Sequence, residues 1–348
     1  VIIVVVSYRY ANTIQDYLDT WGTVLRSRIK IVYYEDLFYR HSFPRGAYIF
    51  TDLERLSERQ LQHADSVRAY LEGQGLPVLN RPGAVLRRYE LLQMLHNEEI
   101  NPFRALRLQE VDDSLRYPVF LRREDDHKGP VSSLIQNTAE LQVAVLDAVY
   151  QGTPPRNLLV VEFCDTADAS GLYRKYSAFL IGDRYIPRHL LFSHKWMTKH
   201  PDIVRESEVS EELHYIFEAP HSHETQVRDI FQRASINYGR IDYALHNGRI
   251  VVWEINTNPT IATPLRRTDP ARIPAFREVS ACLRAAFEEV ADAPVACPGV
   301  PLPMTKALRE ELGVSERNPL KQVLREKSRP IRSRLRDAQA RLVRTITR

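Results

Sequence analysis

Apolar runs and helix-type periodicity alternate along the first 80 residues. The run VIIVVV at 1–6 has the composition of a buried strand, and residues 12–25 repeat apolar side chains at the three-to-four spacing of a helix. Ser57 and Gln60 stand in capping-box positions at the start of a second helical pattern, 57–75. Further apolar strands are predicted at 30–35, 47–53 and 76–80. This alternation predicts a small, mostly parallel α/β domain.

The pattern changes after residue 80, where helices and strands no longer alternate strictly. Strands are predicted at 117–124 and 157–163, and a long strand pair at 173–192. Helices are predicted at 80–95, 137–152, 223–234 and 275–292. This mixture is typical of an α+β arrangement, which we expect to follow the α/β domain.

Length and composition indicate a globular protein of several domains. A chain of 348 residues is long for one compact core, so two or three domains are expected. Cys164, Cys282 and Cys297 are odd in number and widely spaced, which favours neither a disulfide framework nor a zinc site and predicts a reducing, cytoplasmic location. No apolar run reaches the roughly 20 residues of a membrane span, so no integral membrane association is expected.

Positive charge is concentrated at the C-terminal end. Residues 301–348 hold 13 Lys and Arg against 5 Asp and Glu, whereas the whole chain has a net charge of only +4. Nucleic acid is therefore an unlikely partner for residues 1–300, although the basic tail leaves it open. The tail also carries an apolar stripe among its arginines, at Ile331, Leu335, Ala338, Leu342 and Ile346. We expect this stripe to dock on the body or to form a homodimer contact, in preference to binding acidic lipids or RNA.

The stretch GRIDYALHNGRIVVWEINTNPTI at 239–261 places three oxygen-bearing side chains in two apolar strands. A two-residue turn at Asn247 and Gly248 would set Asp242 opposite Trp253 and send Glu254 to the other face. A three-residue loop, 246–248, would set Asp242 opposite Val252 instead. We predict the longer loop, because it separates the polar groups from most of the large apolar ones. One face then carries Asp242, Ala244, Ile250, Val252, Glu254 and Asn256.

Two carboxylates and an amide oxygen on one sheet face predict a cation. Without one, the carboxylates would repel each other and remain poorly paired. Hard oxygen ligands suit Mg²⁺ or Mn²⁺, so Asp242, Glu254 and Asn256 are the predicted metal ligands. The alternative is an ordinary solvated sheet face.

The segment RIDYALHNGRIVVWEINTNP resembles the metal-binding hairpin of the ATP-grasp superfamily, and the resemblance covers about residues 80–290. It implies a pre-ATP-grasp α/β domain at 1–80, a first ATP-grasp lobe at 81–160 and a second lobe at 161–293. A proline-rich linker and basic helical tail would occupy 294–348. The resemblance also implies that ATP lies between the lobes, its phosphates bridged by two Mg²⁺ ions on Asp242, Glu254 and Asn256.

Further site residues follow from this resemblance. The segment NLLVVEFCD is similar to the strand that joins the lobes, where Glu162, Phe163 and Cys164 would offer backbone groups to adenine and Asp165 would hold the ribose. Arg88 and Arg122 take positions where related ligases place phosphate-binding lysines, and Arg123 competes with Arg122 for that role. The loop REDDHKGPVSS has one glycine, so the side chains of His127, Lys128, Ser132 and Ser133 replace backbone contacts to phosphate, or the loop has another task.

The cationic strand pair at 173–192 supplies the predicted catalytic groups. By resemblance to peptide-forming ATP-grasp ligases, Arg188 stabilises the developing oxyanion or acyl phosphate, and Lys175 reaches the phosphates or the substrate. If Arg188 only holds the substrate, its loss would act on substrate affinity instead. His189 exchanges protons near neutral pH or faces outward.

These features predict an ATP-dependent ligase that activates a small-molecule carboxylate as an acyl phosphate and couples it to an amine. A phosphotransferase acting on a small-molecule acceptor would use the same nucleotide site and is the first alternative. A nucleotide-binding module without turnover is the second. Zinc hydrolase chemistry is excluded because the sequence has no clustered His or Cys ligands.

Overall fold

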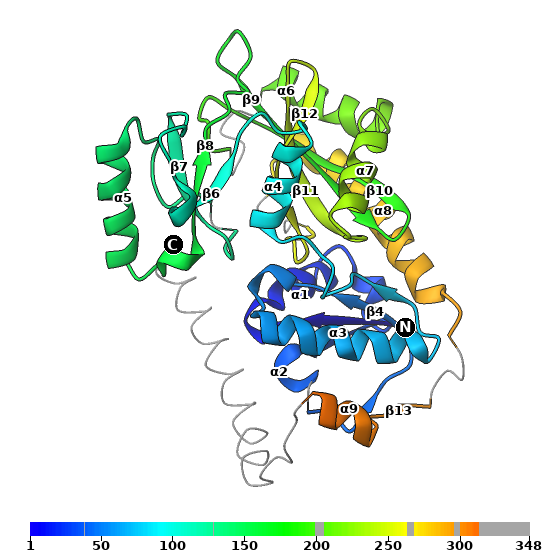
Figure 1. Cartoon of the computed structure of the whole chain (residues 1–348). Helices are drawn as coiled ribbons and strands as arrows, with labels where there is room; N and C mark the ends of the chain where they lie inside the picture. Colours follow the sequence, from blue (N-terminus) through cyan, green and yellow to red (C-terminus); the bar gives the residue numbers. More distant parts are fainter. Residues whose placement is uncertain (38, 128, 199–204, 263–267, 296–299, 313–348) are drawn as a thin grey trace, which may run out of the picture.

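The computed structural model describes residues 1–37, 39–127, 129–198, 205–262, 268–295 and 300–312. Its N-terminal part, blue in Figure 1, contains a parallel four-stranded sheet, whose strand order is β2-β1-β4-β5. The strands are β1 (Ile2–Val6), β2 (Ile29–Tyr33), β4 (Ala47–Phe50) and β5 (Val78–Leu79). The predicted parallel α/β domain is therefore confirmed.

The helices of this domain follow their local signals. In α3 (Glu58–Gly73), Ser57 and Gln60 form the predicted capping box. The helix predicted over 12–25 is shorter: α1 (Asn12–Leu18) ends before the Asp-Thr-Trp-Gly segment, and a 3-10 turn takes up 23–25. Gly22 packs directly on the Tyr17 ring, which leaves no room for a side chain there. A short α2 (Tyr34–Leu37) follows β2.

A second sheet, of order β6-β8-β7, is antiparallel and three-stranded. It contains β6 (Ala105–Arg107), which no sequence pattern indicated, with β7 (Val119–Arg123) and β8 (Leu158–Glu162). α5 (Thr138–Tyr150) contributes Leu141 and Ala148 to the core of this lobe. The sheet continues to Glu162, so β8 runs across residue 160, where the first lobe was predicted to end.

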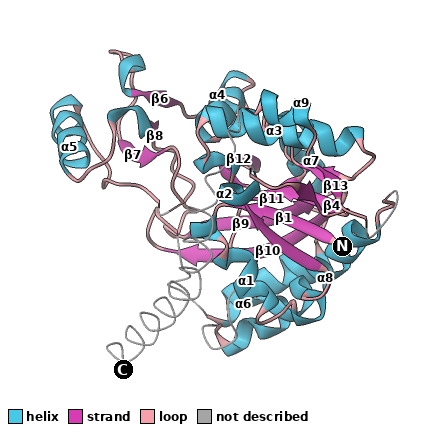
Figure 2. Cartoon of the chain, turned by 90° about the horizontal axis from the view of Figure 1, so that it is seen from below, coloured by secondary structure: helices cyan, strands magenta, loops and turns pink. Residues whose placement is uncertain are grey.

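A third sheet, of order β10-β9-β11-β12, is antiparallel and four-stranded (Figure 2). It consists of β9 (Tyr173–Ile181), β10 (Arg184–Ser193), β11 (Tyr238–His246) and β12 (Arg249–Asn256). Its helical neighbours are α4 (Arg88–Asn97), α6 (Glu206–Leu213) with a π-helical turn (His214–Glu218), and α8 (Ile273–Asp292). α7 (Glu224–Arg233) contributes Val227, Ile230 and Phe231 to the same core. α8 runs on from this lobe to the N-terminal domain, where Ala291 accepts a hydrogen bond from the terminal amine of Val1 (Figure 1). The predicted order of an α/β domain followed by two α+β lobes is confirmed.

Residues 302–312 return to the N-terminal domain. β13 (Leu302–Pro303) pairs with β3 (Ser42–Phe43), and α9 (Lys306–Glu311) follows. Leu302, Met304, Leu308 and Leu312 are buried in the core of the first domain. This part of the predicted linker and tail is thus docked, whereas the apolar stripe at 331–346 lies outside the described residues. Among the residues described, no helix combines the length and apolarity needed to cross a bilayer.

Candidate active site

The β11–β12 hairpin sets Asp242 directly opposite Glu254. Its turn has two residues, Asn247 and Gly248, both with positive φ (51° and 74°), so the predicted three-residue loop is wrong. The extra residue needed to bring the carboxylates together is Trp253, where a bulge shifts the register between Asp242 and Tyr243. Because Asn247 and Gly248 form a tight two-residue turn, the extra residue is not in the turn. It lies in β12, next to the polar residues.

The predicted polar face is confirmed by this register, although its apolar members differ. Ala244 lies opposite Val251, whereas Val252 pairs with Tyr243 and Ile250 with Leu245. Val252 and Ile250 therefore belong to the other face, because the bulge reverses the alternation beyond it. Asp242, Glu254 and Asn256 are all buried.

The polar row continues across the whole sheet. Ser177 on β9 lies opposite Asp242 and, on its other side, opposite His189 on β10. The Ser177 hydroxyl donates a hydrogen bond of 2.9 Å to Asp242. Glu254, Asp242, Ser177 and His189 therefore form one row on a single sheet face.

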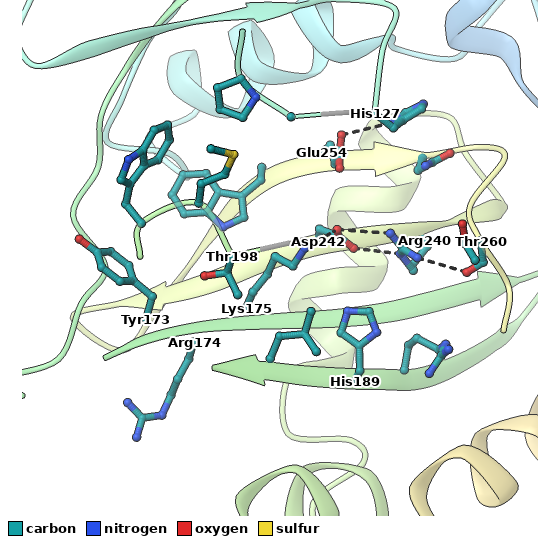
Figure 3. Close-up of a pocket in the computed structure, with 18 of the residues that line it drawn as sticks. His127, Tyr173, Arg174, Lys175, His189, Thr198, Arg240, Asp242, Glu254 and Thr260 are labelled. Carbon is teal, nitrogen blue, oxygen red and sulfur yellow. Dashed lines mark hydrogen bonds and ion pairs between the residues drawn. The ribbon is translucent and has the colours of Figure 1, made fainter. Parts of the chain in front are cut away.

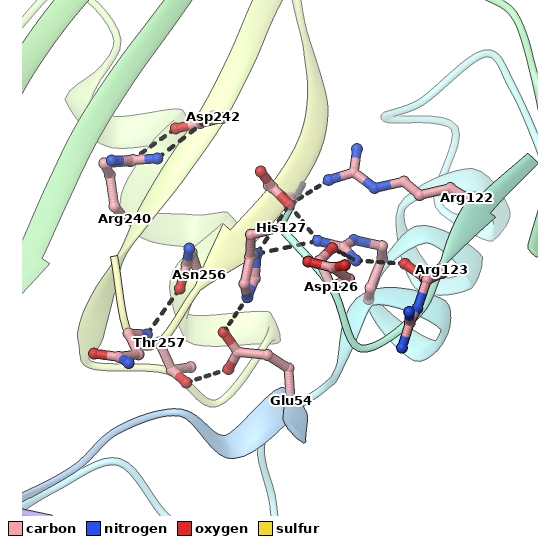
Figure 4. Close-up of polar contacts among 12 residues, drawn as sticks. Glu54, Arg122, Arg123, Asp126, His127, Arg240, Asp242, Asn256 and Thr257 are labelled. Atoms are coloured by element: carbon pink, nitrogen blue, oxygen red, sulfur yellow. Dashed lines mark hydrogen bonds and ion pairs between the residues drawn. The ribbon is translucent and has the colours of Figure 1, made fainter. Parts of the chain in front are cut away.

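Each of the two carboxylates is paired with cations (Figure 4). Glu254 accepts hydrogen bonds from Arg88 and from Arg122 (2.5 Å). Asp242 accepts them from Arg240 Nε (2.9 Å) and Lys175 Nζ (3.3 Å). Burial acts to raise the pKa of both carboxyl groups, but the adjoining cations outweigh it and hold both below their usual range. Both groups are therefore ionised at neutral pH.

Arg88 is engaged mainly with backbone. Its Nη1 donates to the carbonyl oxygens of Arg123 and Glu124, at 2.8 Å each, and of Asp126, at 2.7 Å. The residue is buried and opens α4. Arg88 therefore fixes the loop after β7 against Glu254, and its predicted contact with phosphate remains a prediction.

Arg122 and Arg123 differ clearly in position. Arg122 lines the cavity described below, whereas the Nε of Arg123 faces Asp125 at 3.4 Å. Burial and then the neighbouring Arg88 lower the pKa of Arg122 to about 10, so it stays charged at neutral pH. Of the two arginines, the geometry favours Arg122 for the predicted phosphate contact.

His127 connects three parts of the chain. Its Nε2 lies 2.6 Å from Glu54 of the N-terminal domain, and its Nδ1 lies 3.4 Å from Glu254. Glu54 also accepts a hydrogen bond from the Thr257 hydroxyl. The predicted loop residue His127 thus belongs to the site, together with Glu54, which no sequence pattern indicated.

A cavity of 790 Å³ lies over this sheet face (Figure 3). One end is apolar, and Trp196 there packs against Phe120 and Phe163 with ring centroids 5.0 and 5.8 Å apart. Cys164 and Met197 also line this end, and burial raises the pKa of the Cys164 thiol to about 11, which keeps it protonated. The opposite end contains Lys175, Asp242, Glu254 and Asn256. An apolar slot joined to a charged floor matches the two halves of a nucleotide.

In the segment predicted to contact adenine, two backbone N–H groups already donate hydrogen bonds within the protein. The backbone N–H of Glu162 donates to Arg104 O and that of Phe163 to Pro118 O, both at 2.9 Å. The Glu162 carboxylate is buried and paired with Arg104 and Arg116. Phe163 and Cys164 line the cavity, whereas Glu162 does not.

Asp165, the predicted ribose contact, is exposed beside the cavity. It accepts a hydrogen bond from the backbone N–H of Ala167 at 3.0 Å, and the hydroxyl of Tyr173 also bonds to it. Tyr173 itself lines the cavity. Asp165 is therefore within reach of a cavity ligand through this tyrosine.

Several residues lining the cavity were not predicted. Arg240 stands two residues before Asp242, so the alternation of a strand already places both on one face, and this signal was available in the sequence. Asn258, which donates its backbone N–H to Asn256 Oδ1 at 2.8 Å, also bonds Thr13 of the N-terminal domain at 2.6 Å. Arg55 and Arg272 enter from distant segments, and only the fold brings them here.

The donor set fits a hard divalent cation. Two ionised carboxylates converge with an amide oxygen, which is the ligand chemistry that Mg²⁺ and Mn²⁺ prefer. Among the described residues no three His, Cys, Asp or Glu side chains are arranged so that they could hold a metal ion, so Asn256 is needed to complete the set. A cation binding there competes with Arg88, Arg122, Lys175 and Arg240 for the same oxygens.

Comparisons with known proteins give structural similarity only. No protein-family model and no curated protein matches the chain. Among solved structures, D-alanine–D-alanine ligase from Bacillus anthracis, complexed with ATP, is 15% identical with a TM-score of 0.47, over 82% of this chain and 98% of that one. The Helicobacter pylori D-alanine–D-alanine ligase is 12% identical, with a TM-score of 0.47 and coverages of 84% and 99%.

A third similar structure is the RimK domain protein ATP-grasp from Sphaerobacter thermophilus DSM 20745. It is 13% identical, with a TM-score of 0.45 and coverages of 82% and 98%.

Proposed function

We propose that this chain is an ATP-dependent ligase that activates a carboxylate as an acyl phosphate and couples it to an amine. One observation carries the proposal: the opposed carboxylates Asp242 and Glu254, with their cations, form the floor of a cavity whose other end is aromatic. In the proposal, the base of ATP occupies the apolar end beside Phe163 and Trp196. The phosphates then lie over the charged floor.

The proposed reaction has two steps. A carboxylate oxygen attacks the γ-phosphorus of ATP while the bond to the ADP oxygen breaks, giving an acyl phosphate. The amine nitrogen then attacks the acyl carbon, and phosphate leaves with the former carboxylate oxygen while the amine proton passes to solvent. Arg122, Lys175 and Arg240 supply positive charge beside the transferring group. Asp242, Glu254 and Asn256 are the side chains that would hold Mg²⁺ or Mn²⁺, which when bound neutralises phosphate charge.

A phosphotransferase would use the same nucleotide site and a hydroxyl acceptor. Lys175 and Arg240, which pair with Asp242, place positive charge where the acceptor would meet the phosphates. Positive charge there suits a carboxylate acceptor better than a neutral hydroxyl, and we therefore favour the ligase.

Nucleotide binding tests the proposal directly. Calorimetry with a non-hydrolysable ATP analogue is expected to show Mg²⁺-dependent binding that Asp242→Asn abolishes. ADP release is expected only when a suitable carboxylate is supplied. Nucleotide binding that is indifferent to Mg²⁺ and to Asp242→Asn would contradict the assignment of the metal site.

A further inference from the structure

A β-bulge turns two neighbouring polar side chains of β10 toward the same cavity. Adjacent strand residues normally point to opposite faces. Here Pro187 lies opposite Ala178 and His189 opposite Ser177, which leaves Arg188 as an extra residue between them. Both Arg188 and His189 line the cavity. Bulges of this kind commonly redirect a side chain beside a functional site.

Arg188 is held in place but forms no ion pair with any residue that the structure describes. The residue is 4% exposed, its Nε donates to the carbonyl oxygen of Ile261 at 3.1 Å, and its guanidinium lies 4.6 Å from the centroid of the Phe276 ring. Within the described part of the chain, Arg188 Nη1 and the buried Nε2 of His189 have no hydrogen-bond partner. Both groups therefore have unused hydrogen-bonding capacity inside the cavity.

The other cationic side chains of the cavity differ in this respect. In the described structure each forms an ion pair with a carboxylate: Arg55 with Asp52, Arg122 with Glu254, Arg174 with Asp168 and Glu211, Lys175 and Arg240 with Asp242, and Arg272 with Glu212. A buried charge without a partner is strongly unfavourable. Arg188 thus stands out as a cation whose partner is expected to come from a ligand.

The charge states at this bulge limit the kind of ligand. Burial, followed by the neighbouring Arg240, lowers the pKa of Arg188 to about 9, so the guanidinium is still charged at neutral pH. Burial and then Arg188 hold the pKa of His189 well below its ordinary value, so the imidazole is neutral. The bulge offers one positive charge and one neutral ring nitrogen.

We infer that Arg188 and His189 form a subsite for a carboxylate group of a substrate that is recognised but not phosphorylated. The inference rests on the proposed function and deepens it. The Nη1–H of Arg188 and, in the tautomer protonated on Nε2, the Nε2–H of His189 can donate to the two oxygens of a singly charged carboxylate. A phosphate dianion has more charge and more oxygens than these two groups satisfy.

The position of the subsite separates it from the reacting group. β10 and β11 are two strand spacings apart, or about 10 Å, so a carboxylate at His189 lies away from the phosphates over Asp242 and Glu254. One substrate, either the acid or the amine, therefore carries a carboxylate besides the one that is activated, and the product retains it. Arg188 then acts in recognition, which is the second of the two roles that the sequence left open for it.

A binding experiment with simple anions tests the subsite. Carbon-13-labelled succinate is titrated into the full chain and followed by NMR line broadening, with acetate and inorganic phosphate as competitors. Arg188→Met is expected to weaken succinate binding at least about tenfold, because it removes a charged hydrogen-bond donor. His189→Phe is expected to weaken it less. Arg184→Met is the matched control, since Arg184 lies on the same strand but is exposed and paired with Glu289.

Three results would overturn the inference. Equal succinate binding by wild type and Arg188→Met overturns it, as does a lack of succinate binding by wild type. Phosphate that displaces succinate more effectively than acetate does would make this a phosphate site and would also overturn it. Once the natural substrates are known, removing the non-reacting carboxylate from the acid or from the amine shows which of the two substrates occupies the subsite.

Thermal unfolding and nucleotide binding distinguish a substrate-binding role of Arg188 from a structural role and from a role in the nucleotide site. Arg188→Met is expected to leave the ligand-free Tm unchanged or raised, whereas loss of a structural ion pair would lower it. Affinity for the ATP analogue is expected to be unchanged in Arg188→Met, and a parallel fall would place Arg188 in the nucleotide site instead. If wild type binds no nucleotide but its succinate affinity still depends on Arg188, the proposed function fails and the subsite stands.

Discussion

Asp242 lies directly opposite Glu254 on adjacent strands, with both carboxylates on one buried face of the sheet. Two like charges at this spacing destabilise a sheet unless something compensates them. Arg88 and Arg122 compensate Glu254, while Lys175 and Arg240 compensate Asp242. Metal and phosphate binding at this floor is therefore coupled to the rearrangement of these ion pairs.

Removing the charge of Glu254 is expected to affect both stability and binding. Glu254→Gln leaves Arg88 and Arg122 without their carboxylate, so we expect the free energy of unfolding to fall by about 3 kcal/mol. Mg²⁺-dependent nucleotide binding is expected to disappear in the same variant. Denaturant unfolding and calorimetry measure the two effects. Asp292→Asn, at an exposed ion pair with Arg28, is the control and should change stability by less than about 1 kcal/mol.

Arg88 and Arg122 are expected to differ in function. Arg88→Lys has a single nitrogen with three N–H donors and cannot bond Glu254 as well as the three carbonyl oxygens, so it should destabilise the fold by about 2 kcal/mol and increase hydrogen exchange in the loop 123–127. Arg122→Met should weaken binding of the ATP analogue at least about tenfold, without the increase in hydrogen exchange of the loop. If Arg88→Lys leaves the exchange of the loop unchanged, its assigned role is wrong.

Glu162 gives the chain an acid-sensitive ion pair. Burial acts to raise its pKa, but hydrogen bonds from Arg116 and Arg104 outweigh this and lower it to about 2. A depressed pKa contributes stability above the ordinary carboxyl value of 4.5, and this contribution is lost as the pH falls toward 2. Glu162→Gln should therefore lower stability at neutral pH by about 2 kcal/mol and flatten the acid limb of the unfolding profile. An unchanged acid limb would contradict this account.

Residues 302–312 are expected to stabilise the N-terminal domain. Leu308 is buried in its core, so Leu308→Ala should reduce the free energy of unfolding by about 2–4 kcal/mol. Glu310→Ala, on the exposed side of the same helix, is the control. Deleting residues 301–348 should cause a comparable loss, whereas deleting 313–348 should leave nucleotide binding intact. Equal stability of Leu308→Ala and wild type would show that this segment does not support the domain.

Local sequence signals predicted most elements of the fold. The capping box of Ser57 and Gln60 marks the start of α3, and Asn247-Gly248 marks the hairpin turn. Strand alternation also placed Asp242, Glu254 and Asn256 on one face. The cause of this arrangement was predicted wrongly, as a three-residue loop. The bulge at Trp253 that produces it depends on packing around the hairpin and not on a local sequence pattern.

The supporting residues of the site could not be read from sequence. Glu54 reaches His127 from a segment 73 positions away, and Arg272 pairs with Glu212 across 60 positions. Such contacts exist only after the domains have packed. The bulge at Arg188 is equally hidden, because simple alternation would place Arg188 and His189 on opposite faces.

The transfer of oxygen from the carboxylate to phosphate tests the central claim most directly. In a ligase, phosphate leaves with an oxygen that belonged to the activated carboxylate. A substrate carboxylate labelled with heavy oxygen is therefore predicted to pass one label to the released phosphate, as measured by mass spectrometry. ADP formation with unlabelled phosphoryl attached to an acceptor hydroxyl would contradict the ligase account and identify a phosphotransferase.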